Sequence, residues 1–380
     1  MRSTATKPKL LSVLGTRPEA IKLAPVIQGL KSDAFFDSSV VVTGQHREML
    51  DQVLNVFSIK PDYDLHVMSH NQTLAHLTGQ ILEKLDPVFA KEAPDIVLVQ
   101  GDTTTVFVAA FLAYCRRIPV AHLEAGLRTF DKYSPFPEEG NRRLTGVLAD
   151  LHFCPTETSK ANLLREGVSE SSIHVTQNTV IDALLHVAGQ TIPRPKALRG
   201  VNFNNRIFTV TMHRRENQGR PFEEISAILK KIVAEFPDVE VVFPVHLSPA
   251  VRRTVWPLLE GQDRIHLIEP LDYIEFTHLL KESFLILTDS GGIQEEAPSL
   301  GKPVIVLRET TERPEGIAAG VSFLAGSDAG KIMDLCTRFL NDPEFYKRTA
   351  AIDNPYGDGR ASKRIVALLK EFLLKRRSES

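Results

Sequence analysis

Carboxylates and a histidine follow several short apolar runs of this chain, where buried strands are expected to end. Asp102 follows the run 96–99, Glu124 follows the run 120–123, and His213 follows a similar run further along. Carboxylates and imidazoles are the side chains that most often move protons in enzymes. We therefore expect acid–base chemistry, although Asp102 has an alternative role as a helix N-cap and His213 as a core histidine. Glu124 is the hardest to explain structurally, because a loop that continues Ala-Gly does not need a carboxylate there.

An anion-binding pattern surrounds the apolar run 285–287, which is typical of a parallel strand buried on both faces. Ser290 follows this strand, Gly291 and Gly292 permit a tight turn, and a helix is expected over 293–300. The first N–H groups of a helix lack partners within it, and its positive end favours negative charge. The segment therefore predicts a phosphate site. The cations that follow it are Arg308 and Arg313.

Two further motifs have both a functional and a structural interpretation. Arg17 lies in the loop after the first expected strand, and Lys22 lies just after this loop. The two residues are either cations that bind a ligand or part of the surface of a tight turn. Glu138 and Glu139 follow a proline-rich stretch, as catalytic carboxylates or as acids in the first turn of a helix.

Recognised metal and hydrolase motifs are missing from the sequence. The candidate ligands His66, His70 and His76 have no carboxylate or cysteine at the spacing of a known metal site, so we expect no metal there. The GxSxG and HExxH patterns do not occur, which argues against the usual hydrolases.

The composition favours a two-domain protein that binds a small molecule. A length of 380 residues exceeds the usual size of one core. The 45 basic and 47 acidic residues nearly balance and are scattered, so neither nucleic acid nor an anionic membrane is the expected partner. The three cysteines are far apart, and no apolar run approaches the length of a membrane span. We expect a cytoplasmic protein.

Short β-rich runs alternate with helical stretches through most of the chain, which predicts an α/β fold of two doubly wound, Rossmann-like domains. A polar, proline-containing stretch from about Thr191 is the expected linker. We place the first domain at 1–188 and the second at 189–360, and expect the final helix 361–376 to pack back on the first. Ligands of such sheets collect at the carboxyl ends of the strands, so we expect the site in the inter-domain cleft.

These observations predict a phosphorylated or nucleotide ligand, but they name neither a sugar nor a reaction. The order of motifs along the chain is more specific. The sequences GTRPEAIKLAPV, TGQHREMLDQVL, QGDTTT, HLEAGLRT, YSPFPEEGNRR, HRREN, PVHLSP and TDSGGIQEEAPSLGKPV resemble the non-hydrolysing UDP-N-acetylglucosamine 2-epimerases of bacteria. The resemblance implies a GT-B fold, a homodimer, and reversible conversion of UDP-GlcNAc to UDP-ManNAc without a cofactor, for cell-surface polysaccharide. The implied mechanism eliminates UDP to form 2-acetamidoglucal and then adds it back.

The resemblance also implies roles for individual residues. The implied catalytic residues are Asp102, Glu124, Glu138 and His213. The implied substrate-binding residues are Arg17, Lys22, Leu271, Phe276, Ser290, Gly291, Gly292, Glu296 and Arg313. Among these, Glu296 is similar to the residue that accepts from the ribose hydroxyls, and Phe276 to the residue placed against uracil. The sequence leaves open which carboxylate removes the proton.

Some positions depart from the pattern of the family. Met212 and Gln177 stand where relatives commonly have glycine. The implied allosteric segment keeps three residues, Gln45, His46 and Arg47, whereas Glu48 and Asn71 replace a glutamine and an arginine. The sequence therefore leaves open whether the substrate activates the protein. It also leaves open a GT-B glycosyltransferase, which needs an acceptor, a hydrolysing epimerase, and a non-catalytic nucleotide-sugar sensor.

Overall fold

The computed structural model describes residues 7–44, 47–68, 72–214, 217 and 219–379. The chain forms two compact units, Met1–Ala183 with Gly359–Ser380 as unit one, and Leu184–Asp358 as unit two. Each unit is a parallel sheet with helices around it, which confirms the predicted α/β class. The units divide within helix α7 (Thr179–Ala188), whereas the expected boundary lay at its end.

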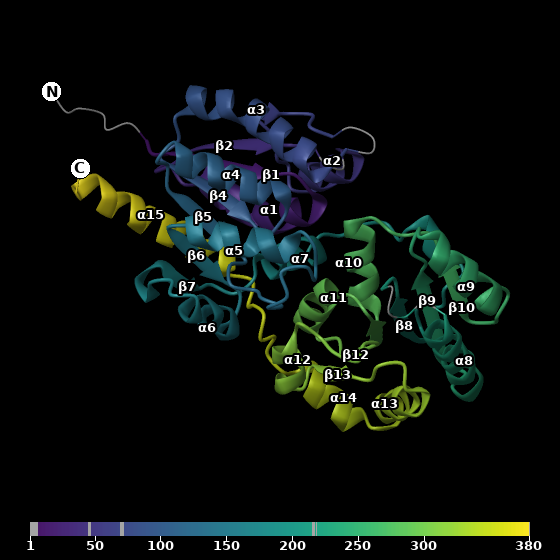
Figure 1. Cartoon of the computed structure of the whole chain (residues 1–380). Helices are drawn as coiled ribbons and strands as arrows, with labels where there is room; N and C mark the ends of the chain where they lie inside the picture. Colours follow the sequence, from purple (N-terminus) through teal and green to yellow (C-terminus); the bar gives the residue numbers. More distant parts are fainter. Residues whose placement is uncertain (1–6, 45–46, 69–71, 215–216, 218, 380) are drawn as a thin grey trace. The chain divides into compact units, whose positions relative to one another are not determined.

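Unit one contains a seven-stranded sheet with the strand order β3-β2-β1-β4-β5-β6-β7 (Figure 1). Its strands are β1 (Lys9–Leu14), β2 (Asp37–Val42), β3 (Tyr63–Asp64), β4 (Ile96–Gln100), β5 (Val120–Leu123), β6 (Leu151–Cys154) and β7 (Ile173–Val175). Its helices, besides the first part of α7, are α1 (Arg17–Ser32), α2 (Arg47–Val56), α3 (Leu74–Glu92), α4 (Thr104–Cys115), α5 (Glu138–Leu148), α6 (Glu157–Arg165) and α15 (Ala361–Glu379). A short 3-10 turn covers Glu170–Ser172. Because β1, β4 and β5 are neighbours, the loops that follow them meet at one edge of the sheet.

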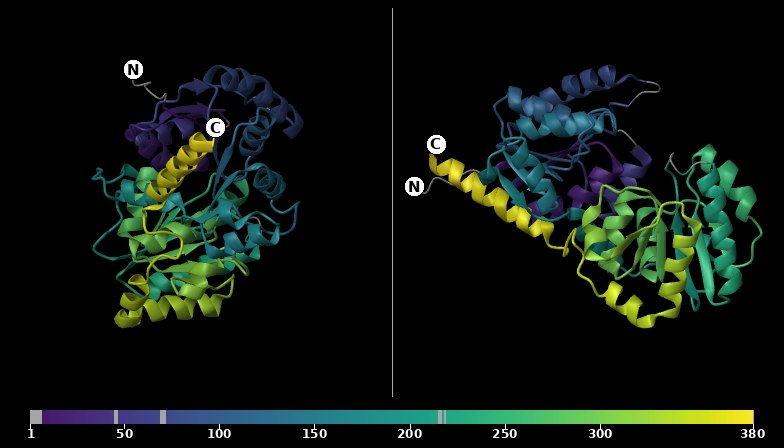
Figure 2. Two further views of the ribbon diagram at one scale, coloured as in Figure 1. Left: turned by 90° about the vertical axis from the view of Figure 1, so that its left-hand side faces the viewer. Right: turned by 60° about the horizontal axis from the view of Figure 1, so that its bottom comes forward.

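The long helix α15, yellow in Figure 2, packs against α1 of unit one. Gly29 permits this approach, since a Cβ there would lie 3.1 Å from Cγ2 of Val366. The start of α15 is held by the buried Asp182 of α7, whose carboxylate accepts the backbone N–H groups of Ala361 and Ser362. A carboxylate at a helix start satisfies donors that the helix itself leaves unpaired.

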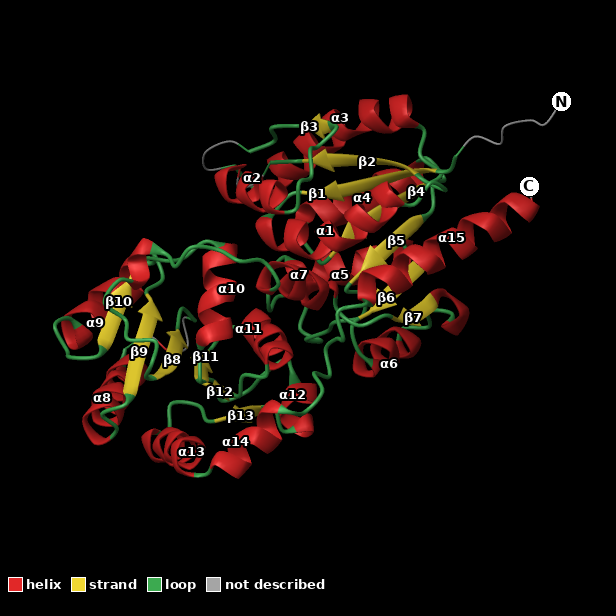
Figure 3. Ribbon diagram, turned by 180° about the vertical axis from the view of Figure 1, so that it is seen from behind, coloured by secondary structure: helices red, strands yellow, loops and turns green. Residues whose placement is uncertain are grey.

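Unit two contains a six-stranded sheet with the order β10-β9-β8-β11-β12-β13 (Figure 3). Its strands are β8 (Arg206–Thr211), β9 (Val239–Pro244), β10 (Ile265–Ile268), β11 (Leu285–Thr288), β12 (Val304–Val306) and β13 (Ser322–Leu324). Its helices are α8 (Arg220–Glu235), α9 (Pro249–Leu259), α10 (Tyr273–Glu282), α11 (Gly291–Glu296), α12 (Pro314–Ala319), α13 (Ala329–Asn341) and α14 (Pro343–Ala350). Short 3-10 turns cover Lys196–Leu198 and Ala297–Leu300.

The helix expected over 293–300 differs in the structure. It begins at Gly291 and continues as an α-helix only to Glu296, after which the chain tightens into the 3-10 turn Ala297–Leu300. The turn ends at Gly301, whose φ of 66° is the left-handed conformation that glycine adopts most easily. The earlier start places Ser290 at the N-cap position.

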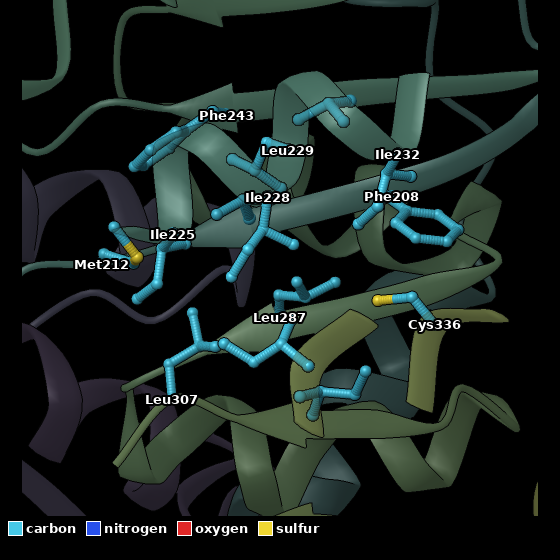
Figure 4. Close-up of a cluster of buried hydrophobic side chains, with 14 of the residues drawn as sticks. Phe208, Met212, Ile225, Ile228, Leu229, Ile232, Phe243, Leu287, Leu307 and Cys336 are labelled. Carbon is cyan, nitrogen blue, oxygen red and sulfur yellow. The ribbon is translucent and has the colours of Figure 1, made fainter. Parts of the chain in front are cut away.

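An apolar core lies between α8 and the sheet of unit two (Figure 4). It contains Phe208 of β8, Phe243 of β9 and Leu287 of β11, all fully buried. Met212, one of the departures from the family pattern, belongs to this core and is 1% exposed. Its side chain therefore fills apolar space that a glycine would leave empty.

Gly15 lies where three loops of unit one converge. A Cβ at this position would lie 2.4 Å from Oγ1 of Thr43 and 2.5 Å from Oγ1 of Thr105. These two hydroxyls are 3.0 Å apart and hydrogen-bond each other, so neither can move aside without losing a buried contact.

We expect Gly15→Ala to destabilise unit one by about 1–3 kcal/mol through overpacking. Thermal unfolding followed by circular dichroism measures the effect. The matched control is Gly79→Ala in α3, because a Cβ there meets nothing within 4 Å. That control should gain up to about 1 kcal/mol from helix propensity. Equal behaviour of the two variants would contradict the steric argument.

Candidate active site

Glu124 is held in a defined position at the carboxyl end of β5. Nζ of Lys22 lies 2.6 Å from Oε1 of Glu124, and the side-chain amide of Gln100 donates to Oε2. The Glu124 side chain is only 8% exposed. The backbone of Glu124 has a φ of 59°, which is rare for a residue other than glycine. Such strained backbone concentrates at functional sites. The structure thus joins Lys22 and Glu124, two of the predicted site residues, in a partly buried ion pair.

Asp102 lies in the loop after β4, directly after Gly101 with its φ of 84°. Its Oδ2 atom is 2.7 Å from Nη2 of Arg142, a residue of α5. The backbone carbonyl of Asp102 accepts from the side-chain amide of Asn141 at 2.9 Å. Thr103 is the N-cap of α4, so the alternative role of Asp102 as that cap is wrong.

The two neighbouring glutamates at the start of α5 have different surroundings. Glu139 is fully buried, and its carboxylate accepts the backbone N–H groups of Thr129 and Phe130 and pairs with Arg142 at 3.2 Å. Glu138 is the first residue of the helix and is half-buried. Glu139 therefore has a structural task, and Glu138 is the more exposed of the two.

The loop after β1 contains a buried carboxyl group, Glu19, that the sequence interpretation passed over. Its Oε2 atom accepts the backbone N–H groups of Gly15 at 2.5 Å and Thr16 at 3.2 Å, at the start of α1. Burial raises the pKa of Glu19 to about 7, although these hydrogen bonds and one from Thr103 oppose the shift. Arg17, the first residue of α1, is half-buried.

In unit two, the buried Asp289 organises the residues after β8. Its carboxylate accepts the backbone N–H groups of His213 and Arg214, each at 2.9 Å, and the side-chain amide of Asn217 at 2.9 Å. Nδ1 of His213 lies 3.0 Å from Oδ1 of the same carboxylate. Burial by itself would raise the pKa of Asp289, but the hydrogen bonds from His213 and Arg214 lower it below its usual value.

The pairing with Asp289 determines what His213 can do. Since a carboxylate only accepts, Nδ1 must carry the proton, and Nε2 is the nitrogen that can take or give a proton. The side chain is 37% exposed and stacks on His246 with ring centroids 5.5 Å apart. His213 is therefore not the fully buried core histidine of the alternative interpretation.

The expected phosphate site also has its residues close together. A Cβ on Gly291 would lie 3.5 Å from Cζ of Arg313, and a Cβ on Gly292 would lie 3.8 Å from Oε1 of Glu296. Arg313 is held by the buried Glu295, with Nε 2.6 Å from Oε1. Ser290, Gly291, Gly292, Glu296 and Arg313 thus surround the start of α11. Arg308 pairs instead with Glu312 at 2.6 Å.

Leu271 and Phe276 lie on either side of the N-cap of α10, Asp272. Both are partly buried and pack against the same small apolar cluster, which includes Leu198 and Ile207. A partly buried aromatic ring beside a helix start offers a face against which a planar base can lie.

Several expectations concern positions that the structure does not describe. Gln45, His46 and Asn71 of the implied allosteric segment lie outside the described residues, as do the side chains of Arg47 and Glu48. His70 is also outside them. Within the described ranges, no group of three or more histidine, cysteine, aspartate or glutamate side chains is placed to hold a metal. No helix of the same ranges is long and apolar enough to cross a membrane.

The sequence analysis missed several residues that hydrogen-bond to, or pair with, the predicted site residues. Asp289 orients His213, Arg142 pairs with Asp102, and Gln100 donates to Glu124. A signal for Asp289 was present, because it ends an apolar strand as Glu124 does. The pairing of Arg142 with Asp102 had no such signal, since the two residues are 40 positions apart in the chain.

A family model and two curated relatives place the chain in the same protein family. The chain matches the family described as UDP-N-acetylglucosamine 2-epimerase over residues 28–370. The UDP-N-acetylglucosamine 2-epimerase of Bacillus subtilis (strain 168) is 53% identical over 360 residues, which cover 95% of this chain and 94% of the relative. The enzyme of the same name from Escherichia coli (strain K12) is 52% identical over 369 residues, with coverages of 95% and 98%.

A solved structure extends the similarity to the fold. The crystal structure of UDP-GlcNAc 2-epimerase from Neisseria meningitidis bound to UDP-GlcNAc is 49% identical in sequence, with a TM-score of 0.87. The match covers 96% of this chain and 100% of that one. The predicted two-domain GT-B fold is thereby confirmed.

The buried Glu19 predicts a pH-dependent stability. Its folded-state pKa of about 7 lies above the ordinary value of 4.5, so the neutral acid is favoured on folding. This contribution is fully present below pH 4.5 and is lost as the pH rises towards 7. We expect Glu19→Gln, which cannot ionise, to gain stability relative to the wild type across that range. The gain has an upper limit of about 3 kcal/mol.

Urea unfolding of both proteins at pH 4.5 and pH 8 measures this difference. Gln keeps an oxygen that can accept from Gly15 and Thr16, so the loop geometry should survive. A difference between the two proteins that does not change with pH would show that Glu19 is not the buried acid described.

Proposed function

Because this chain belongs to the UDP-N-acetylglucosamine 2-epimerase family, we propose that it interconverts UDP-GlcNAc and UDP-ManNAc by inverting carbon 2 of the sugar. The proposal rests most directly on two carboxylates of unit one that ion pairs hold in place. Binding a nucleotide sugar does not require Glu124 paired with Lys22, or Asp102 paired with Arg142. Inverting a carbon centre requires groups that remove and return a proton.

The reaction we propose has two balanced halves. In the first, a base removes the proton from carbon 2, the bond between carbon 1 and the UDP oxygen breaks, and 2-acetamidoglucal forms. In the second, a proton is added to the opposite face of carbon 2 and the UDP oxygen reattacks carbon 1. No electrons are gained or lost overall, so the reaction needs no redox cofactor. UDP must stay bound between the halves, because its return is the second reactant.

In unit one, we assign the proton transfers to Asp102, Glu124 and Glu138. The charges of Asp102 and Glu124 are each balanced by a cation, which keeps a carboxylate in place without a water shell. Lys22 and Arg17 are the cations of this unit that we place near the sugar and the diphosphate.

In unit two, we assign UDP to the residues around the start of α11. The backbone N–H groups after Ser290 and the Arg313 guanidinium would bind the diphosphate, and Glu296 would accept from the ribose hydroxyls. Phe276 and Leu271 would contact uracil. His213, held by Asp289, would present Nε2 to the substrate as a proton donor or acceptor.

Incubation with UDP-GlcNAc alone in deuterated water tests the function. We expect UDP-ManNAc with deuterium at carbon 2, because the proton removed exchanges with solvent before one is returned. A glycosyltransferase would leave the sugar unchanged without an acceptor, and a hydrolysing epimerase would release free ManNAc and UDP. A nucleotide-sugar sensor would return the substrate unlabelled. Any of these last three results would overturn the proposal.

Variants of the carboxylates in unit one should lose turnover, whereas variants of the UDP site in unit two should lose affinity for UDP. We expect Asp102→Asn and Glu124→Gln to lower turnover by at least about 100-fold, the usual scale for a lost acid or base. Both should keep the affinity for UDP, measured by titration calorimetry. Ser290→Ala is the matched contrast and should weaken UDP binding instead. Near-normal turnover of both carboxylate variants would remove them from the chemistry.

A homodimer is the assembly we propose. The contacting helices α4 and α5 of unit one expose Phe111, Tyr114, Leu144 and Val147, the last with 82% of its surface exposed. A second copy would cover this apolar face. Light scattering at micromolar concentration measures the mass, and a monomeric mass would contradict the proposal.

We also propose a cytoplasmic location, consistent with the free cysteines Cys115, Cys154 and Cys336.

A further inference from the structure

A buried histidine, His122, contacts the loop that carries Asp102. His122 is the third residue of β5, two positions before Glu124, and is 1% exposed. Its Nε2 atom lies 2.7 Å from the backbone carbonyl oxygen of Gly101. Gly101 immediately precedes Asp102 and has a φ of 84°, so the direction of the chain changes at this residue.

The protonation of His122 follows from its partner. A carbonyl oxygen can only accept, so Nε2 must carry the hydrogen. Burial lowers the pKa of His122 to about 3, which keeps the ring neutral with Nδ1 unprotonated. In the described part of the chain, no hydrogen-bond partner reaches Nδ1. A leucine would fill similar space without this cost, so the donated bond to Gly101 is what the histidine contributes.

The loop has few other restraints on its position. Gly101 donates its own N–H to the carbonyl of Leu123 at 3.1 Å, and the carbonyl of Asp102 accepts from Asn141. A Cβ on Gly101 would meet nothing within 4 Å, so side-chain packing does not hold this residue. The bond from His122 is therefore one of three that hold the backbone of Gly101 and Asp102, and the Asp102 carboxylate is in addition paired with Arg142.

From this geometry we propose that His122 is a positioning residue of the epimerase reaction, which fixes Asp102 through the Gly101 carbonyl. The inference rests on the proposed function, since it gives His122 a task in a reaction in which Asp102 takes part. His122 itself need not touch the substrate. Its effect should fall on the rate of the chemical steps, because a carboxylate displaced by about 1 Å can cost about 100-fold in rate.

The chain offers a matched control in His152 of β6. His122 and His152 are directly paired across the two strands, and both are 1% exposed. His152 makes the same kind of bond, with Nε2 2.9 Å from the carbonyl of Gly146. Gly146 lies near the end of α5, whose position does not depend on one hydrogen bond. Loss of either histidine should therefore cost similar stability, but only His122 should affect the Asp102 loop.

The test compares His122→Leu, His122→Gln and His152→Leu in the full chain. We expect His122→Leu to lower kcat about 10- to 100-fold with KM changed less than about threefold. Gln can place an amide N–H near the position of Nε2, so His122→Gln should recover kcat to within about threefold of wild type. His152→Leu should have a melting temperature similar to that of His122→Leu and a kcat near wild type. Equal kcat values for the two leucine variants would overturn the proposal.

Two further measurements separate this proposal from the proposed function. In an Asp102→Asn background, His122→Leu should lower kcat by no more than about twofold further, because its effect passes through Asp102. A full additional loss would contradict the positioning role while leaving the epimerase activity intact. Hydrogen–deuterium exchange needs no activity: His122→Leu should speed exchange of segment 101–104, and His152→Leu should not. Unchanged exchange in His122→Leu would refute the proposal even if the wild type made no UDP-ManNAc.

Discussion

A carboxylate that is buried at the end of a strand must be supplied with hydrogen-bond donors, and this requirement shapes both candidate sites. Glu124 receives Lys22 and Gln100, and Asp289 receives two backbone N–H groups, Asn217 and His213. Removing such donors would leave a charge without compensation in a poorly hydrated place. The donors come from neighbouring segments of the same unit, so satisfying one carboxylate also fixes the segments around it.

The sequence predicted the parts of the site that follow from strand order. Short apolar runs marked β4, β5, β8 and β11, and the polar residues after them lie at the carboxyl ends of their sheets. The α/β class, the GT-B fold and the family are confirmed, while the roles of individual residues stay predictions. The pairs Asp102–Arg142 and His213–Asp289 could not be predicted, because each depends on how segments that are distant in the chain pack together.

The two departures from the family pattern have different structural consequences. Met212 is a core residue of unit two, so the change adds apolar contacts beside the strand end that leads to His213. Gln177 keeps a positive φ of 70°, a conformation that glycine adopts at lower cost. Its side chain accepts from Nη1 of Arg364 at 2.9 Å, a contact to α15 that glycine cannot make.

The return of α15 to unit one has a consequence for the order in which the chain folds. Unit two is one continuous segment, whereas unit one combines Met1–Ala183 with Gly359–Ser380. During synthesis, unit two can therefore be complete while the first unit still lacks a helix. Until residues 361 and 362 emerge, the Asp182 carboxylate has not yet met the N–H groups that it accepts, and the face of α1 around Gly29 is still uncovered. The part of the protein that is made first is thus the part that is finished last.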